Sequence, residues 1–532
     1  MTMSKLNLEN IIQYLGKLTF RNKILLMILL GALSALSFAP FYIFPFLIVC
    51  YPLFMLMSII SDQPKYAFYK GFVFGFGHFF AGLYWIGNSV IVEADIPNWV
   101  GPIMVTFIAI YLSLFPGLVA YVLKYIHRNH TVSKNLLNIS ISFIVLWSFS
   151  EWLRGMLFTG FPWNLMGYIW GFSDIMLQST AIWGIYGLGL ITLILSILAF
   201  FALVNRWRII SAPVVILGII GLYSFGSSRL PETIEYVEQV NLKVVQANIQ
   251  QKDKWPYENW SKNLITHMDM SDDNKAENKD IIIWPETAVI YSISEEPLRR
   301  DVMSSILNEE DILLTGFPRR QRDPDQTRIF NSLIAINKEG NIEGIYDKSH
   351  LVPFGEYIPS FITNIMIPLG LDKMFTGGQG FSHGEGIKTL NIDGMPSVGV
   401  LICYEIIFPG QVTDPENRPD WLLNITNDAW YGESTGPYQH VLQTRVRAIE
   451  EGLPLVRSAS TGISAIIDPY GRIVDQIGLN KRGVVEGALP QKLLERTLYS
   501  FLKEWIFTCI GVTLIIVNIV LLRRRHPQKD KA

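Results

Sequence analysis

The chain has 532 residues, of which 50% are hydrophobic and only 17% are charged, and its formal net charge is −2. Soluble domains carry about 25% charged residues, so this composition indicates a membrane protein with a soluble part. A net charge so close to zero argues against a nucleic-acid-binding protein, which would need a basic face.

Apolar runs dominate the chain up to about residue 226. A polar segment with scattered basic residues covers 1–23, and the apolar run 24–38 that follows it could be a signal peptide. We interpret it instead as an uncleaved first helix of a membrane domain over 24–226, because further spans follow at once. Each of these is close to the ~20 residues that cross a bilayer. The further candidate spans are 42–60, 69–91, 101–124, 137–158, 180–204 and 209–226.

Basic residues between the spans predict how the chain is oriented. The loops after the second, fourth and sixth spans carry Lys and Arg, whereas the opposite loops carry Arg154 and almost no other basic residue. Because basic loops stay in the cytoplasm, the N-terminus is predicted to be cytoplasmic and residues 227–498 to lie outside. A C-terminal transmembrane helix within 499–522 then returns the chain, and a basic cytoplasmic tail over 523–532 ends it.

The composition of 227–498 differs from that of the spans. Charged residues return, and short apolar runs of β type alternate with polar stretches and helical patterns, which is typical of an α/β domain whose strands are buried on both faces. No GxGxxG, Walker, HExxH or CxxC pattern occurs, so we expect no cofactor and no metal. The expected strands are 242–245, 281–284, 312–315, 332–336, 398–402, 421–425, 455–458 and 464–467, with helices at 257–272 and 437–452.

Cys403 stands at the end of one of these apolar runs. It is the only cysteine of the soluble part, since Cys50 and Cys509 fall in membrane-like runs. It therefore has no disulfide partner there and can stay a free thiol even in an oxidising compartment. A buried core cysteine is the simpler interpretation when this run is considered alone.

Two further motifs favour a catalytic interpretation of Cys403. Glu286 follows the run 281–285, and Lys348 lies between it and the cysteine. A thiol is mostly protonated at neutral pH, and a nearby carboxylate can take its proton. A lysine at the same point would favour the thiolate and stabilise the oxyanion that forms when a carbonyl is attacked. Alone, Glu286 could start a helix and Lys348 could be a surface lysine; it is their conjunction with Cys403 that points to nucleophilic catalysis.

These motifs resemble those of the nitrilase superfamily of carbon–nitrogen hydrolases over about residues 241–490. The matching stretches are Trp-Pro-Glu-Thr-Ala at 284–288, Lys-Ser-His-Leu-Val-Pro-Phe-Gly-Glu at 348–356 and Cys-Tyr-Glu at 403–405. With the membrane spans included, the chain is similar to the branch of that superfamily whose membrane-bound members acylate bacterial lipoproteins. The resemblance implies an αββα sandwich beside the multi-span helical domain, in the bacterial inner membrane, with the sandwich on the periplasmic side.

The resemblance also implies a reaction and the roles of three residues. Glu286 would be the general base, Lys348 the oxyanion stabiliser and Cys403 the nucleophile. The thiolate would attack an acyl ester of a phospholipid, usually phosphatidylethanolamine, and form a thioester. The α-amino group of a diacylglyceryl-cysteine at the start of an apolipoprotein would then take the acyl group, with ping-pong kinetics.

Further residues are expected around the site. The resemblance implies Glu356, Tyr404 and Glu405 as supporting residues. It places Trp255 on a mobile arm near the site. The apolar segment 359–376, which follows directly, could be a second arm that dips toward lipid, with Phe361 and Ile365 contacting the lipid substrate. A buried core segment is the alternative for 359–376.

Two other functions are weighed against acyl transfer. A membrane-tethered amidase or nitrilase would use the same three residues on small molecules. Eight spans and apolar arms are more than such an enzyme would need to be anchored in the membrane. A transporter or a receptor would be expected to carry ionisable residues along a path through the membrane. The spans are nearly free of them, apart from His78, Glu151 and Arg154.

Overall fold

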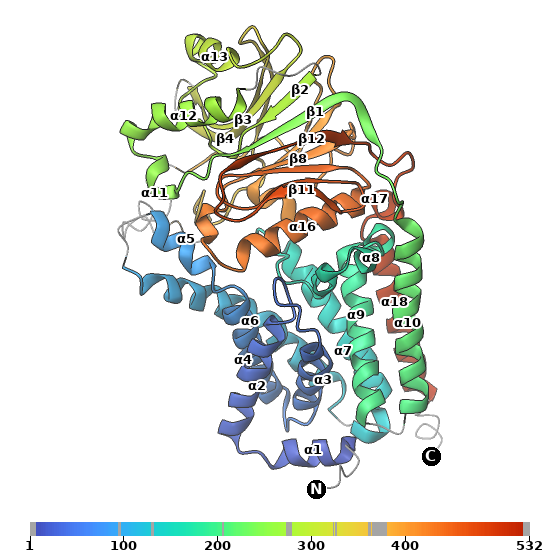
Figure 1. Ribbon diagram of the computed structural model, residues 1–532. Helices are drawn as coiled ribbons and strands as arrows, with labels where there is room; N and C mark the ends of the chain where they lie inside the picture. Colours follow the sequence, from blue (N-terminus) through green and yellow to red (C-terminus); the bar gives the residue numbers. More distant parts are fainter. Residues whose placement is uncertain are drawn as a thin grey trace. The chain divides into compact units, whose positions relative to one another are not determined.

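The structure is a computed structural model that describes residues 7–93, 97–128, 132–204, 207–272, 279–322, 324, 327–359, 363 and 380–524. It consists of two compact units (Figure 1). The helical unit comprises Met1–Ile91, Asp95–Leu230 and Thr497–Ala532, and the sandwich unit comprises Val92–Ala94 and Pro231–Arg496.

The helical unit contains helices of very different length. Five of those described are long and apolar enough to cross a membrane, namely α6, α7 over Asn135–Met156, α9, α10 and α18. The helices are α1 (Leu8–Lys17), α2 (Phe20–Ala35), α3 (Pro45–Ile59), α4 (Pro64–Gly82), α5 (Ile86–Glu93), α6 (Val100–Ile126), α7 (Val132–Met156), η1 (Met166–Phe172), α8 (Asp174–Leu177), α9 (Thr180–Val204), α10 (Arg208–Arg229), α17 (Leu498–Leu502) and α18 (Trp505–Arg524).

The first three predicted spans correspond to shorter or less apolar helices. α2 has 16 residues and α3 has 15, while α4 has 19 and carries Lys65 and Lys70 near its start. The predicted span 69–91 is not one continuous helix. α4 ends at Gly82 and α5 begins at Ile86, and the chain turns between them. At this turn, the ring centroids of Trp85 and Trp163 lie 4.8 Å apart.

Glycines let α2, α4 and α6 approach one another closely. A Cβ atom placed on Gly31 of α2 would lie 2.0 Å from the carbonyl oxygen of Phe74 in α4, and one on Gly71 of α4 would lie 2.4 Å from that of Pro116 in α6. Neither distance is possible for a real side chain. Small residues at such crossings are the usual means of packing helices in lipid, where van der Waals contact drives association.

The sandwich unit is built on two six-stranded sheets, in the orders β12-β1-β2-β3-β4-β5 and β11-β10-β9-β8-β7-β6. β1, β2 and β3 are parallel to one another, as are β7, β8 and β9, and the outer strands are antiparallel. The strands are β1 (Tyr236–Gln246), β2 (Lys279–Ile283), β3 (Ile312–Arg322), β4 (Thr327–Ile336), β5 (Ile342–Asp347), β6 (Thr389–Leu390), β7 (Val398–Ile402), β8 (Trp421–Thr426), β9 (Leu455–Ala459), β10 (Ser464–Ile467), β11 (Ile473–Ile477) and β12 (Gly483–Pro490).

Alternate side chains of each central strand enter two different cores. Ile281 and Ile283 of β2 join the core between the sheets, together with Val400 and Ile402 of β7. Ile282 faces the opposite way, into a core covered by α12 (Tyr257–Ser271) and α13 (Pro297–Ser304). In Figure 1, α16 (Gly436–Glu451) runs along the other sheet. Strands buried on both faces explain the near-continuous apolar runs in the sequence, and the predicted αββα sandwich is confirmed.

The parallel strands bring several polar residues to one edge of the sandwich unit. The carboxyl ends of parallel strands meet at the same edge of a sheet, where α/β enzymes bind their ligands. Glu286 comes three residues after the end of β2, Cys403 directly follows β7, and Lys348 directly follows β5.

Candidate active site

Cys403 lies at a sharp turn between a buried strand and a short helix. It leaves β7 and begins the 3-10 helix η2 (Cys403–Ile407) with φ +52°, a left-handed conformation that few non-glycine residues adopt. Strain of this kind persists only where the surroundings hold it and is common at active sites. Cys403 is only 7% exposed, so the packing around it holds the thiol and the left-handed backbone in place.

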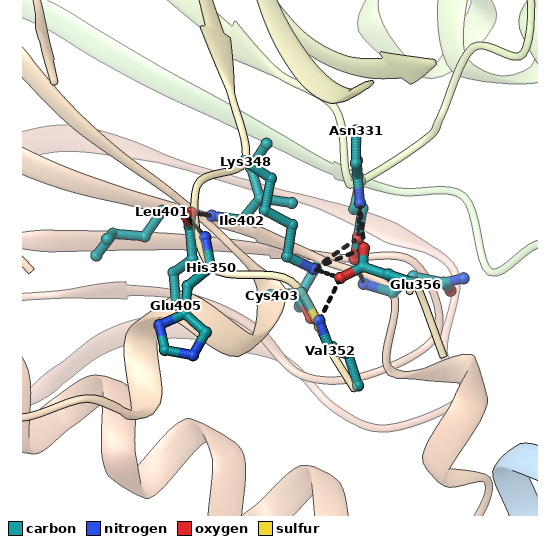
Figure 2. A network of polar contacts seen from close by, with 12 residues as sticks. Asn331, Lys348, His350, Val352, Glu356, Leu401, Ile402, Cys403 and Glu405 are labelled. Atoms are coloured by element: carbon teal, nitrogen blue, oxygen red, sulfur yellow. Dashed lines mark hydrogen bonds and ion pairs between the residues drawn. The ribbon is translucent and has the colours of Figure 1, made fainter. Parts of the chain in front are cut away.

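Glu405 supplies part of that support. One carboxylate oxygen accepts from the backbone N–H of Ile402 at 2.7 Å. The other accepts from the N–H groups of Ser349 and His350 at 2.7 and 3.0 Å. Burial raises the pKa of Glu405, although these donors oppose the shift. The buried carboxyl thus joins the turn at Cys403 to the segment that follows Lys348 (Figure 2).

Glu286 is held by donors from two other elements. Oε1 accepts from the side-chain amide of Asn331 at 2.7 Å, and Oε2 accepts from the backbone N–H of Asn427 at 2.7 Å. The side chain is buried, and the next residue, Thr287, is left-handed with φ +49°. These contacts fix the direction in which the carboxylate points.

Lys348 lies between two carboxylates. It is 1% exposed, and its Nζ is 2.8 and 2.9 Å from the two oxygens of Glu356 and 3.8 Å from Oε1 of Glu286. Burial alone would lower its pKa, but the charges of Glu356 and Glu286 outweigh burial and raise it. Lys348 is therefore a permanent cation at the centre of the cluster in Figure 2.

Electrostatics keep the thiol protonated at rest. Burial and then the charge of Glu286 raise the pKa of Cys403 to about 12, while Lys348 and a hydrogen bond with Thr426 oppose the shift. A neutral thiol beside an oriented carboxylate is the starting arrangement for general-base activation, in which the proton moves as the sulfur attacks.

The other predicted site residues occupy different environments. Glu356 and Glu405 contact the cluster as described above. The buried ring of Tyr404 packs on Phe408, with centroids 5.1 Å apart. Trp255 is 41% exposed. Phe361 and Ile365, and nearly all of 359–376, fall outside the described residues.

Sequence reasoning missed the residue that joins the two carboxylates. Asn331 of β4 donates from Nδ2 to Glu286 at 2.7 Å. The same amide donates to Glu356 at 2.9 Å (Figure 2). The signal available in the sequence was a polar residue inside the otherwise apolar run at 329–336. A polar residue in such a run points to a buried hydrogen bond but does not identify its partner.

Sequence reasoning also missed a buried network beneath the turn at Cys403. Arg457 donates to Asp428 at 2.7 Å, and His440 Nδ1 lies 3.1 Å from the same carboxyl. Asn424 accepts from Arg457 and donates to the carbonyl oxygen of Leu401 at 3.1 Å. Burial alone would raise the pKa of Asp428, but Arg457 and His440 outweigh it and hold the pKa below its usual range.

Neither unit offers a metal centre in the part of the chain that the structure describes. No group of three or more His, Cys, Asp or Glu side chains there is arranged to hold an ion. The cluster of Glu286, Lys348 and Cys403 combines a buried carboxylate, a buried cation and a thiol, and these are the kinds of group that covalent acyl chemistry uses.

Comparisons with known proteins cover both units. Residues 242–499 match the carbon-nitrogen hydrolase family, and residues 30–198 match the N-terminal domain of apolipoprotein N-acyltransferase. The apolipoprotein N-acyltransferase of Rhodopseudomonas palustris is 36% identical over 94% of this chain and 95% of its own length. That of Rickettsia prowazekii is 35% identical over 94% and 99%. A crystal structure of a carbon–nitrogen hydrolase superfamily protein from Xanthomonas campestris is 17% identical and covers 48% of this chain and 91% of that one, with a TM-score of 0.34.

Proposed function

The chain belongs to the apolipoprotein N-acyltransferase family, and from this premise we propose that it carries a fatty acyl group on Cys403 from a phospholipid to an apolipoprotein. Phosphatidylethanolamine is the proposed donor, and the α-amino group of an N-terminal diacylglyceryl-cysteine is the proposed acceptor. The observation that carries the proposal is the cluster of Cys403, Glu286 and Lys348 in one buried site.

The first half-reaction loads the thiol. The sulfur of Cys403 attacks the ester carbonyl carbon of the phospholipid while Glu286 takes the thiol proton. The tetrahedral oxyanion is stabilised by the ammonium group of Lys348 and by the backbone N–H of Tyr404. The carbon–oxygen ester bond then breaks, the leaving alkoxide takes the proton from Glu286, and a lysophospholipid departs from a thioester.

The second half-reaction transfers the acyl group. The neutral α-amino group of the acceptor attacks the thioester carbonyl, and Glu286 takes a proton from the nitrogen. The carbon–sulfur bond breaks, and the sulfur recovers the proton from Glu286, so that the enzyme returns to its starting state. Because one base serves both halves, the orientation that Asn331 and Asn427 impose on Glu286 matters twice.

The helical unit gives this chemistry its setting. Five apolar helices of membrane-spanning length, together with the named relatives, indicate a bacterial inner-membrane protein. We further propose that the catalytic part, assigned from the sequence to 227–498, faces the periplasm and that both termini are cytoplasmic. The basic loops between the predicted spans support this orientation.

The proposal is tested by acyl transfer in phospholipid vesicles. Phosphatidylethanolamine with a labelled acyl chain is supplied with a diacylglyceryl-cysteine peptide, and the peptide is analysed by mass spectrometry. We expect one labelled acyl group on the peptide amine. Double-reciprocal plots of the initial rate should give parallel lines when the two substrates are varied. The rate of acyl transfer should fall by at least about a thousandfold in Cys403→Ala and in Glu286→Gln. Hydrolysis of small amides without any transfer to the peptide would instead favour a membrane-tethered amidase.

A further inference from the structure

We propose that Lys254 is a second active-site lysine, a positioning residue whose buried positive charge offsets the carboxylates of the site and favours the Cys403 thiolate. Lys254 ends the short helix α11 (Gln251–Lys254) and directly precedes Trp255. The inference rests on the proposed role of Cys403 as nucleophile, and it assigns the lysine an electrostatic task in that same site.

The contacts of Lys254 point into the site. Its side chain is 4% exposed, and its Nζ donates to the backbone carbonyl oxygen of Glu286 at 2.8 Å. In the described part of the chain, the ammonium group contacts this carbonyl and no carboxylate. Burial lowers the pKa of Lys254 to about 8, and the charges of Glu286 and Cys403 oppose that shift, so both groups lie within electrostatic range.

The segment that carries Lys254 is fixed to the same base. Gln251, at the start of α11, accepts from the side-chain amide of Asn427 at 2.8 Å. The backbone N–H of Asn427 donates to the Glu286 carboxylate at 2.7 Å. Two contacts therefore hold α11 close to Glu286. Lys254 contacts the backbone carbonyl of Glu286, and Gln251 contacts Asn427, which in turn binds the Glu286 carboxylate.

The charge balance of the buried cluster gives Lys254 its task. Glu286 and Glu356 supply two negative charges, and Lys348 supplies one positive charge. One negative charge is thus left uncompensated in a site where burial makes such a charge costly. Lys254 offsets it. When Cys403 loses its proton beside the ionised Glu286, a further negative charge appears in the site, and the positive charge of Lys254 stabilises it.

The other ionisable groups around Cys403 do not supply the missing positive charge. Glu405 is a carboxyl whose oxygens accept from the backbone N–H groups of Ile402, Ser349 and His350. Asp428 disfavours the thiolate, but Arg457 and His440 contact its carboxylate directly. Burial and the charge of Arg457 lower the pKa of His440, and burial raises that of Tyr431, so neither adds a charge at neutral pH. Lys254 is therefore, together with Lys348, a cation that acts on both Glu286 and Cys403.

The test is the rate at which iodoacetamide alkylates Cys403, because alkylation reports the thiolate without any acyl substrate. Full-length protein in detergent is alkylated between pH 6.5 and 9.5, and the Cys403 peptide is quantified by mass spectrometry. We expect Lys254→Met to slow alkylation at pH 7.5 by about tenfold or more, which corresponds to about one unit in the thiol pKa. Lys252→Met, on the exposed side of the same helix, should match the wild type.

Two more variants separate charge from structure. Lys254→Gln keeps a donor for the Glu286 carbonyl but has no charge, so we expect it to behave like Lys254→Met. Lys254→Arg keeps the charge, so we expect it to recover most of the rate. If Lys254→Met does not fold, the alkylation rates of Lys254→Gln and Lys254→Arg are compared instead, and they show whether the charge is needed. Wild-type alkylation in Lys254→Gln across the whole pH range would overturn the proposal.

The result is independent of acyl transfer. If the wild type fails to transfer acyl groups while Cys403 still alkylates in a manner that depends on Lys254, the proposed function fails and the role of Lys254 stands. If acyl transfer occurs but alkylation is the same with and without the Lys254 charge, the proposed function stands and the role of Lys254 fails.

Discussion

Asn331 shows how one neutral side chain organises a charged site. Its amide nitrogen carries two hydrogens, and one is directed to Glu286 and the other to Glu356. The two carboxylates would otherwise repel each other across Lys348, which is closer to Glu356 than to Glu286. In the proposed mechanism, this bridge keeps Glu286 oriented for proton exchange while Glu356 holds the lysine.

Replacing Asn331 should therefore impair the chemistry more than substrate binding. A hydrogen bond to a charged group contributes about 1.5–3 kcal/mol, so Asn331→Leu should lower kcat for acyl transfer by about 10- to 100-fold. Asn331→Asp should lower it further, because a third carboxylate would face the other two. Asn337→Leu, at a hydrogen-bonded turn beyond the end of β4, serves as the control. An unchanged kcat with a raised KM in Asn331→Leu would contradict this account.

At the scale of elements, the turn at Cys403 depends on three segments packed beneath it. Asn424 comes from β8, Asp428 from the 3-10 helix η3 (Asp428–Tyr431) and Arg457 from β9. Their network is fully buried and reaches the carbonyl of Leu401, two residues before Cys403. A buried ion pair of this kind is weak as a source of stability but costly to break, and it specifies one arrangement of the chain around it.

Breaking the ion pair should destabilise the protein and change its response to acid. Asp428→Asn leaves Arg457 with an uncompensated buried charge, and we expect a loss of about 3–5 kcal/mol. The folded-state pKa of Asp428 lies below its unfolded value, so its contribution is complete above about pH 4 and is lost as the pH falls toward the folded pKa.

Unfolding of the full chain in detergent between pH 3 and 7 checks both points. The wild type should lose stability on acidification by an increment that Asp428→Asn lacks. Asp393→Asn, at an exposed position between β6 and β7, is the control and should keep nearly all of the wild-type stability at pH 7. Equal stability of the wild type and Asp428→Asn at pH 7 would remove the argument that this pair holds the turn.

The sequence predicted some elements of the sandwich unit well and missed others for a physical reason. The apolar runs correspond to β1 to β4 and β7 to β10, because those strands bury both faces. β5, β6, β11 and β12 were not predicted. β5 and β11 are largely half-buried or exposed, and β6 has only two residues, so their sequences lack a continuous apolar run.

The candidate site was only partly visible in the sequence for a similar reason. Glu286, Lys348 and Cys403 belong to local motifs whose residues are adjacent in the chain. Asn331 belongs to none of these motifs, and no role was predicted for Lys254, although it directly precedes Trp255. Their partner Glu286 lies 45 and 32 residues away, respectively. Their roles arise only when strands and loops far apart in the sequence meet at one edge.

At the scale of the whole molecule, the chain of the helical unit is interrupted by the sandwich unit. The sandwich unit is inserted between α10 and the C-terminal helices α17 and α18. Within the helical unit, Asn518 of α18 accepts from Asn138 of α7 at 3.0 Å and donates to Ser142 at 2.8 Å. Hydrogen bonds between α7 and α18 thus link two helices that are far apart in the sequence.

A thioester survives for transfer only where water is kept from it, and the low exposure of Cys403 and Lys348 is consistent with that need. The predicted apolar arm at 359–376 falls almost entirely outside the described residues, and contact of Phe361 and Ile365 with lipid stays a prediction. The requirement itself follows from the proposed order of steps, since the acyl group must wait on Cys403 until an acceptor arrives.

The role of Cys403 as acyl carrier is tested by the intact mass of the purified protein after incubation with phosphatidylethanolamine and no acceptor. We expect a gain of one fatty acyl group that hydroxylamine removes and that Cys403→Ala does not acquire. If folded protein gains no acyl group from any of several phospholipids, Cys403 is not the acyl carrier, and the proposed mechanism loses its first step.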